Sequence, residues 1–181
     1  MALAFIGLGS NLGDGKTNLQ QAWQHLVKDK DITGLAISSP FITKPVAISD
    51  STKPSAGFQF DSGQWFTNAV AVLETRLEAN QLLIKMLAVE NSMGRERGKS
   101  GDRIIDLDIL YYDYLVKNSE ELTIPHPCIQ DRLFVLAPLE ELVPDHLHPL
   151  LNLSSSQMRK RLPFSAEQVV KKISWQEGGN S

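Results

Sequence analysis

Two aspartates interrupt an otherwise apolar run that extends from Ile104 to Leu110. Apolar runs of this length that are bounded by polar segments are typical of a buried strand. Because side chains alternate along a strand, Asp106 and Asp108 would point to the same face, with their carboxylates roughly 6–7 Å apart. Two like charges so close together repel unless a cation lies between them, and oxygen-only ligands at this spacing suit Mg²⁺. The pair therefore predicts a magnesium site.

A basic segment lies directly before this strand. It carries Arg95, Arg97, Lys99 and Arg103 among several glycines. Guanidinium groups pair bidentately with phosphate oxygens, so this segment would supply the other half of a polyphosphate site. The alternative is that the strand merely ends at a solvated face and that the basic residues are surface charge. The apolar neighbours of both aspartates argue against it, because an unpaired buried charge is costly.

Other polar residues stand in apolar surroundings. Asn68 lies within a predicted strand, Glu90 lies on the apolar stripe of a predicted helix, and His126 is held between two prolines. Each is a candidate ligand contact, and a purely structural or solvated role is an open alternative for each. The segment from Asp145 to His148 resembles a metal-binding histidine pair, but a surface turn is the favoured interpretation.

A glycine-rich segment after the first predicted strand offers a rival phosphate site. Residues 10–17 nearly match a P-loop, and the strand with the two aspartates would then hold its Mg²⁺. However, Ser10 stands where a P-loop needs the glycine that lets backbone amides curl around a phosphate. Leu12 likewise stands where a dinucleotide fingerprint needs its third glycine. An ordinary strand-to-helix turn is the better interpretation.

Hydrophobic periodicity gives the order of the elements that would position these residues. Strands are expected at residues 2–8, 32–43 and 65–74 and at the run with the aspartates. The first helix would bury a stripe from Leu19 to Val27, capped by Asp14 or Thr17, and the second would span 79–93 with Leu83, Met86, Leu87 and Glu90 on one stripe.

This order is the ferredoxin-like βαββαβ pattern. It predicts an α+β fold with an antiparallel sheet and both helices on one face. The other face would be left for the carboxylates and for residues 44–64, a segment long enough for a lid or binding loop. A hairpin-like excursion at 114–122 and a helix at 132–142 follow, so extra C-terminal helices are expected beyond the ferredoxin-like unit.

Composition sets broad limits. The chain has 181 residues and a net charge of -3, which indicates one domain over residues 1–181 and no general affinity for nucleic acid or anionic membranes. Its single cysteine, Cys128, excludes an internal disulfide and is consistent with a reducing compartment. The apolar segment 2–8 is too short to cross a bilayer. We expect a cytoplasmic monomer with a frayed tail at 176–181.

The motifs together resemble those of the 6-hydroxymethyl-7,8-dihydropterin pyrophosphokinases of folate biosynthesis. The resemblance covers roughly residues 2 to 143, and its most specific element is the Gly-x-Arg-x-x-Asp-Leu-Asp sequence that ends at Asp108. It also includes residues 7–13, Ser38-Ser39, 43–46, Asn68-Ala69-Val70, Gly94-Arg95, 123–126 and 132–136.

The resemblance implies transfer of the diphosphoryl group of ATP to the pterin hydroxymethyl group, with release of AMP. Two Mg²⁺ ions would be bound by Asp106 and Asp108, and Arg95 and Arg103 would complete the catalytic set. The pterin ring would lie between Phe66 and Phe134, with its edge contacted by Asn68 and by Thr43, Lys44 and Val46. The residues expected to contact ATP are Glu90, Arg95, Arg97, Arg103, Ile109, Thr123, His126 and Arg132.

Two functions of other classes remain as alternatives. A small P-loop kinase would depend on Lys16. A ferredoxin-like regulatory or ligand-binding module would need no catalytic residue at all.

Overall fold

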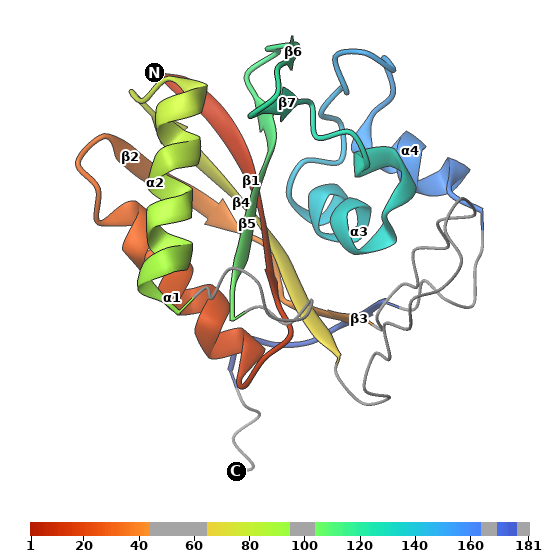
Figure 1. The fold of residues 1–181 in the computed structure, drawn as a ribbon. Coiled ribbons are helices and arrows are strands. Elements are labelled where there is room, and N and C mark those ends of the chain that lie inside the picture. The colour runs from red at the N-terminus through yellow and green to blue at the C-terminus, as the bar shows by residue number, and fades with distance from the viewer. Residues whose placement is uncertain (44–64, 95–103, 164–169, 177–181) are drawn as a thin grey trace, which may run out of the picture.

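The computed structural model of the chain describes residues 1–43, 65–94, 104–163 and 170–176. Within these residues, six strands form an antiparallel sheet in the order β5-β1-β4-β3-β8, and β2 also pairs with β4 (Figure 1). The strands are β1 (Ala2–Ser10), β2 (Ile32–Ile37), β3 (Phe41–Thr43), β4 (Phe66–Thr75), β5 (Asp106–Tyr112) and β8 (Val170–Lys172). The expected ferredoxin-like sheet is confirmed.

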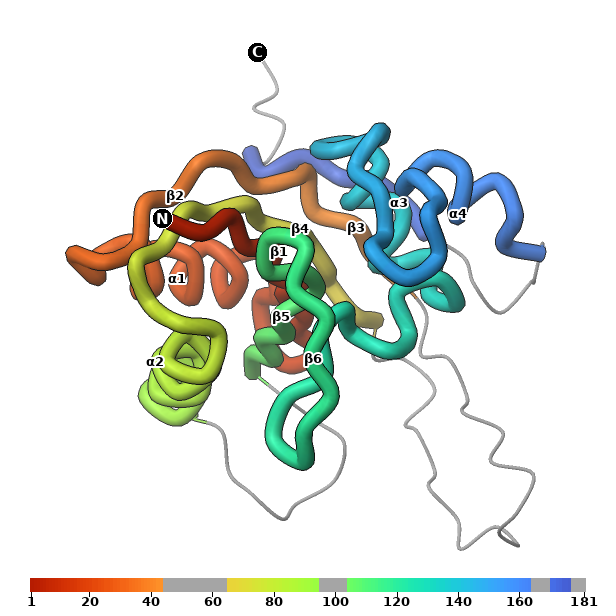
Figure 2. Tube along the Cα trace, turned by 90° about the horizontal axis from the view of Figure 1, so that it is seen from above, coloured from red at the N-terminus to blue at the C-terminus, as the bar shows by residue number. Residues whose placement is uncertain are grey.

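Helices α1 (Gly15–Val27) and α2 (Ala79–Ser92) cover one face of the sheet, while α3 (Leu133–Leu142) and α4 (Ser155–Arg161) lie on the other side (Figures 1 and 2). A short hairpin of β6 (Lys117–Asn118) and β7 (Thr123–Ile124), followed by the 3-10 turn η1 (Ile129–Asp131), leads from β5 to α3. No helix in the described part combines the length and the apolar character that crossing a membrane requires.

The sheet therefore has an apolar core on each face. Side chains of β1, β4 and β5 such as Ile6, Leu73 and Ile109 pack against α1 and α2. Phe5 and Val70 point the opposite way and join a second core with α3 and α4. The expectation that this second face would be left open is wrong around Phe5 and Val70, because the C-terminal helices cover the sheet there. In the part of the chain that the structure describes, the end of the sheet near Asp106 is left for a site.

The first helix begins where its sequence allows a cap. Asp14 accepts hydrogen bonds from the Thr17 backbone N–H at 3.4 Å and from the Thr17 hydroxyl at 2.6 Å. Asp14, rather than Thr17, is thus the N-cap of α1. Because the Asp14 carboxylate accepts the Thr17 N–H, this amide of the helix N-terminus is not free for a phosphate.

The single strand expected at 32–43 is divided into β2 and β3. Ser38 donates its backbone N–H to the Val70 carbonyl at 2.8 Å, and its hydroxyl accepts the Val70 N–H at 3.0 Å. A side chain thus replaces one main-chain partner of β4, and the strand bends there. Pro40, two residues further on, lacks an N–H. β3 therefore starts afresh at Phe41.

The stripe predicted for the second helix is rotated. α2 buries Ala79, Leu82, Met86, Val89 and Glu90, whereas Leu83 and Leu87 are only half-buried. Apolar residues occur on most sides of this helix, so periodicity alone does not fix which side faces the sheet.

The surface turn expected at Asp145–His148 is confirmed in part: Asp145 lies in a turn and is exposed, as is Leu147, whereas His146 is half-buried and His148 is buried. His148 is 4% exposed, and the His146 ring lies 4.5 Å from the Phe5 ring and 4.7 Å from the Tyr111 ring, measured between centroids. Aromatic residues of β1 and β5 thus draw both histidines against the sheet. Among the described residues, no group of three or more His, Cys, Asp or Glu side chains is placed to hold a metal, so the pair is part of the packing.

Candidate active site

Asp106 and Asp108 lie on the edge strand β5 and face the α3 side of the sheet. In the register with β1, Asp106 is opposite Gly9 and Asp108 is opposite Gly7. The alternate residues Leu107 and Ile109 are buried in the core under α1 and α2, so the two aspartates point the other way. Both are half-buried. The predicted sharing of one face is confirmed.

Glycines leave the adjoining surface of β1 without side chains. A Cβ atom at Gly9 would lie 3.2 Å from Asn68 Oδ1, whereas the atom nearest to one at Gly7 would be Leu110 Cδ2 at 3.4 Å. Two glycines at a spacing of two in one strand leave the same face bare. That spacing is readable in the sequence, where we considered these glycines only as parts of a turn motif. They form the floor between the aspartates and the next strand.

Beyond this floor lies a buried polar pair. Asn68 on β4 is paired in register with Gly9 on one side and with Phe41 of β3 on the other. Its amide Nδ2 donates a hydrogen bond of 3.0 Å to Thr43 Oγ1, and both side chains are buried. This contact orients the amide and turns its carbonyl oxygen towards the glycine floor. Phe66, opposite Thr43 in the register, is half-buried.

His126 and Arg132 approach the aspartates from the segment that follows β7. The His126 backbone N–H donates to the Leu110 carbonyl at 3.0 Å, which fixes this segment to the edge of β5. Its Nδ1 accepts the Cys128 backbone N–H at 3.3 Å. Burial lowers the pKa of His126; Asp108 and Asp106 act in the raising direction and Arg132 in the lowering direction, and the resulting pKa is below the usual value. Both aspartates and Arg132 are thus within electrostatic reach of the His126 ring.

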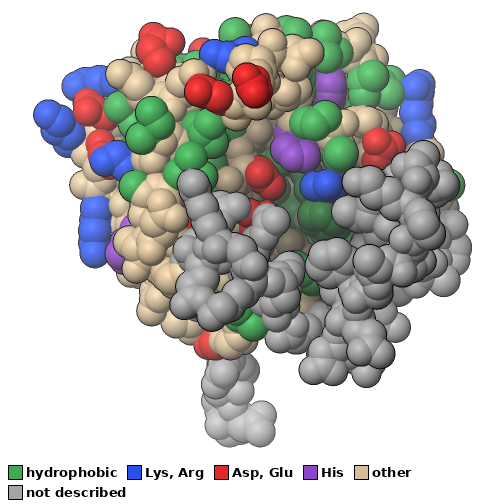
Figure 3. Space-filling model, viewed as in Figure 1, with side chains coloured by type: hydrophobic (Ala, Val, Ile, Leu, Met, Phe, Trp, Pro, Cys, Tyr) green, Lys and Arg blue, Asp and Glu red, His purple; other side chains and the backbone are tan. Residues whose placement is uncertain are grey.

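Arg132 and Phe134 begin helix α3. The Arg132 guanidinium carbon lies 5.7 Å from the centre of the Phe134 ring, within the range of a cation–π contact. Figure 3 shows acidic, basic and histidine side chains close together near the middle of this face of the molecule. Arg132 and both aspartates thus lie near His126, and the Phe134 ring lies next to the Arg132 guanidinium.

Glu90 lies beneath the site rather than in solvent. It is 1% exposed, and its Oε1 accepts the backbone N–H of Leu107 at 2.7 Å. The solvated last turn that the sequence left open is therefore wrong. Ile109 is 3% exposed in the core under α1 and α2, so any contact with ATP would fall to its main chain. Thr123 donates its hydroxyl to Asn118 Oδ1 at 3.3 Å within the β6–β7 hairpin.

The remaining predicted site residues lie outside the described residues. They are Lys44, Val46, Arg95, Arg97 and Arg103. The lid or binding loop expected at 44–64 and the frayed tail expected at 176–181 also fall in parts that the structure leaves undescribed, apart from Gln176. These expectations stay predictions.

The sequence profile of the family described as 7,8-dihydro-6-hydroxymethylpterin-pyrophosphokinase matches residues 5–144. The chain belongs to this family. The 2-amino-4-hydroxy-6-hydroxymethyldihydropteridine pyrophosphokinase of Methylorubrum extorquens is 36% identical over 146 residues, which are 80% of this chain and 85% of that protein. The Bacillus subtilis protein of the same name is 37% identical over 141 residues, 77% of each chain.

Longer proteins also contain a similar region. The folic acid synthesis protein FOL1 of Dictyostelium discoideum is 33% identical over 162 residues, which are 89% of this chain and only 22% of that protein. A crystal structure of Plasmodium falciparum HPPK-DHPS with pteroate gives a TM-score of 0.68 at 15% identity, over 88% of this chain and 42% of that one. At this identity the likeness establishes the fold alone.

Proposed function

We propose that this chain transfers the diphosphoryl group of ATP to the hydroxymethyl group of 6-hydroxymethyl-7,8-dihydropterin, giving the pterin diphosphate and AMP. Family membership and the named relatives support a pyrophosphokinase of folate biosynthesis that acts on small molecules with ATP as co-substrate. The observation that carries the proposal is the placement of Asp106 and Asp108 on one face of β5, beside His126 and Arg132.

The described residues divide into two halves that suit the two substrates. On the β5 side, the aspartates would hold the metal, and Arg132 and His126 would meet the phosphates of ATP. On the β4 side, Asn68 and Thr43 would contact the polar edge of the pterin, between the rings of Phe66 and Phe134. The glycine floor lies between the halves, so the hydroxymethyl group and the reacting phosphate would meet above it.

Magnesium suits the residues that are present. The two carboxylates offer hard oxygen ligands from one face of β5. A pair of carboxylates is the usual protein share for Mg²⁺, which fills its other positions with water and phosphate. We propose two ions at Asp106 and Asp108; when bound, they would neutralise charge on the transferred group. Arg95, Arg97 and Arg103 are proposed to assist from the neighbouring segment.

The decisive experiment separates the nucleotides formed from ATP and the pterin in the presence of Mg²⁺. We expect AMP, and we expect Asp106→Asn and Asp108→Asn each to lower kcat at least about a hundredfold. Asp113→Asn is the matched control, because Asp113 lies just beyond the far end of β5 and accepts the Leu3 N–H at 2.7 Å, a bond that an asparagine oxygen retains. Formation of ADP, or near-normal turnover of Asp106→Asn, would reject the proposal.

The same assay separates the two alternatives. A P-loop kinase requires Lys16, so Lys16→Ala should abolish its activity, whereas we expect a mild effect. A regulatory module would bind its ligand and show no turnover.

Four further properties remain proposals from the sequence: a single domain over residues 1–181, a monomeric state, a cytoplasmic location, and the lack of nucleic-acid or membrane partners. Light scattering of the purified chain tests the monomeric state.

A further inference from the structure

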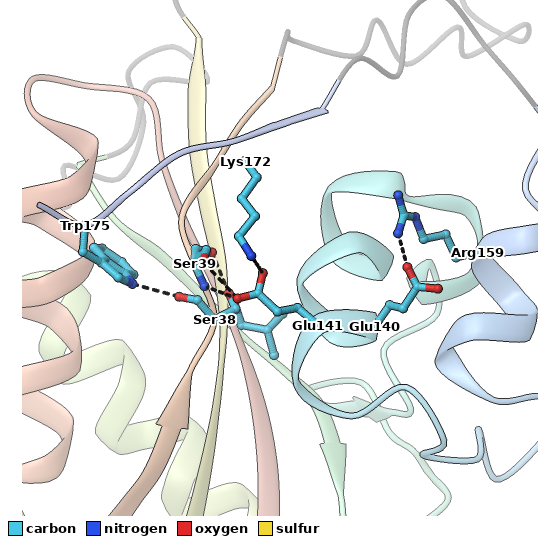
Figure 4. Close-up of polar contacts among 8 residues, drawn as sticks. Ser38, Ser39, Glu140, Glu141, Arg159, Lys172 and Trp175 are labelled. Carbon is cyan, nitrogen blue, oxygen red and sulfur yellow. Dashed lines mark hydrogen bonds and ion pairs between the residues drawn. The ribbon is translucent and has the colours of Figure 1, made fainter. Parts of the chain in front are cut away.

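Glu141, at the C-terminal end of α3, joins three separate segments (Figure 4). Its Oε1 accepts two hydrogen bonds from Ser39, one from the backbone N–H at 3.0 Å and one from the hydroxyl at 2.9 Å. Its Oε2 lies 3.2 Å from Lys172 Nζ on β8. The two oxygens of one carboxylate thus tie α3 to the start of β3 and to the C-terminal strand.

The C-terminal segment has further contacts of its own with the same region. Strand β8 pairs with β3, Val170 opposite Thr43 and Lys172 opposite Phe41. The Ile173 N–H donates to the Pro40 carbonyl at 2.9 Å. Beyond it, the Trp175 indole N–H donates to the Ser38 carbonyl at 3.0 Å. Residues 170–175 therefore cover the outer edge of β3, although the family profile ends at residue 144.

Glu141 joins the two elements that carry the residues proposed to contact the pterin, namely β3 and α3. β3 ends at Thr43, which holds the Asn68 amide, and Phe134 lies in the first turn of α3. Helix α3 lies on the face of the sheet, so the main-chain hydrogen bonds of the sheet do not join it to β3. In addition to the apolar packing of α3 on β1 and β4, the Glu141 carboxylate gives a polar link from α3 to Ser39, just before β3.

We propose that Glu141 is a positioning residue for the pterin substrate, acting with Lys172 and with strand β8 as the brace of β3. This inference rests on the proposed function. It assigns a role to side chains that touch neither substrate: they fix the distance between the Thr43–Asn68 pair and the Phe134 ring. A planar ring held between two walls is sensitive to that distance, because stacking and edge contacts must be made together.

The charge on Glu141 strengthens the link. Burial alone would raise the pKa of Glu141, but the bonds from Ser39 and the ammonium of Lys172 outweigh it, and the pKa is lowered. Hydrogen bonds to a charged acceptor are roughly twice as strong as those between neutral groups. At neutral pH the carboxylate is therefore ionised and fully able to accept from Ser39.

The chain offers a matched control in the preceding residue. Glu140 lies on the same helix, its side chain is 24% exposed against 26% for Glu141, and it pairs with Arg159 of α4 instead. Both carboxylates are drawn in Figure 4. Replacing Glu140 removes an ion pair of similar exposure without touching β3, so any selective effect of Glu141 belongs to its own partners.

The experiment measures KM for the pterin and for ATP in Glu141→Ala, Glu141→Gln and Glu140→Ala. We expect Glu141→Ala to raise KM for the pterin about tenfold and KM for ATP less than about twofold. The free energy of one hydrogen bond to a charged group is large enough to account for a tenfold change in a binding constant. Glu141→Gln keeps an acceptor for Ser39 and should recover most of the loss. Glu140→Ala should leave both constants within about twofold.

A second measurement does not depend on activity. Hydrogen exchange at the amides of Phe41–Thr43 should accelerate in Glu141→Ala and stay unchanged in Glu140→Ala. Equal effects of the two variants, or equal changes in both KM values, would show a merely structural role and overturn the inference. If the wild type makes no AMP, the proposed function fails, while the exchange data still decide whether Glu141 braces β3.

Discussion

Glu90 of α2 accepts the backbone N–H of Leu107 at 2.7 Å, directly between the two aspartates of β5. β5 is an edge strand, paired with β1 alone among the described strands. Its outer N–H groups need partners from elsewhere. A buried carboxylate from a helix fills that need at the one residue that separates Asp106 from Asp108.

Replacing Glu90 should therefore disturb the strand that carries the two aspartates of the proposed metal site. Glu90→Ala leaves the Leu107 N–H unpaired in a buried place, which costs about 2 kcal/mol, and it should also lower kcat. Glu90→Gln keeps an acceptor oxygen and should lose less. Asn91→Ala, at the exposed neighbouring position, is the control for both measurements. Urea unfolding and steady-state kinetics test this; a stable Glu90→Ala protein with full activity would contradict it.

Gly9→Ala should weaken pterin binding. A Cβ there would lie 3.2 Å from Asn68 Oδ1, which forces the amide away from its place beside Thr43, while Gly7→Ala brings a Cβ no nearer than 3.4 Å to Leu110. We expect KM for the pterin to rise several-fold in Gly9→Ala and clearly less in Gly7→Ala. Equal effects on KM in the two variants would speak against a contact between Asn68 and the substrate.

Gly34→Ala should destabilise the fold without a specific effect on the site. The added Cβ would lie 2.5 Å from Trp23 Cζ2 and 2.7 Å from Val27 Cγ1, so these two side chains or α1 itself must shift. Such overpacking costs about 1–3 kcal/mol. The neighbouring Leu35 is 51% exposed, and Leu35→Ala should change the free energy of unfolding by much less. Urea titrations of both variants make the comparison.

Acid should destabilise the packing of α3 and α4 through His146. Burial first, and then His148, lower the pKa of His146 below its usual value. The unfolded chain therefore takes up a proton near the usual pKa while the folded chain does not, and folded stability falls as pH drops through that range towards the lowered pKa. Above the usual pKa the effect vanishes. The free energy of unfolding should thus be lower at pH 5 than at pH 7.5.

His146→Phe supplies the matching control for this pH effect. The ring lies among Phe5, Tyr111 and Tyr114, and His146 Nε2 is buried without a hydrogen-bond partner among the described residues. Phenylalanine keeps the ring contacts and removes the titrating group. The difference in stability between pH 5 and pH 7.5 should shrink in the variant, and an unchanged difference would exclude His146 as its source.

The sequence was sufficient for the parts that depend on local pattern. Alternation along β5 placed Asp106 and Asp108 on one face, and the order of strands and helices predicted the sheet. Contacts between distant residues escaped it: whether Asn68 is structural depends on Thr43, 25 positions away. The break at Ser38 depends on Val70, and the burial of Glu90 depends on a strand N–H that only the folded sheet brings to it. The side of α2 that faces the sheet could not be predicted, because leucines occur on several sides of this helix.

The register of β5 with β1 shifts between Phe5 and Ile6, and the extra residue on β5 is Leu110. Its side chain lies over Gly7, with Cδ2 3.4 Å from the place of a Cβ, and belongs to the apolar cluster below α3. The register shift thus places an apolar side chain between the apolar cluster under α3 and the two aspartates on the same face of the sheet. The apolar side chain of Leu110 lowers the local permittivity beside the aspartates, so their attraction for a cation is stronger than at a strand end surrounded by water.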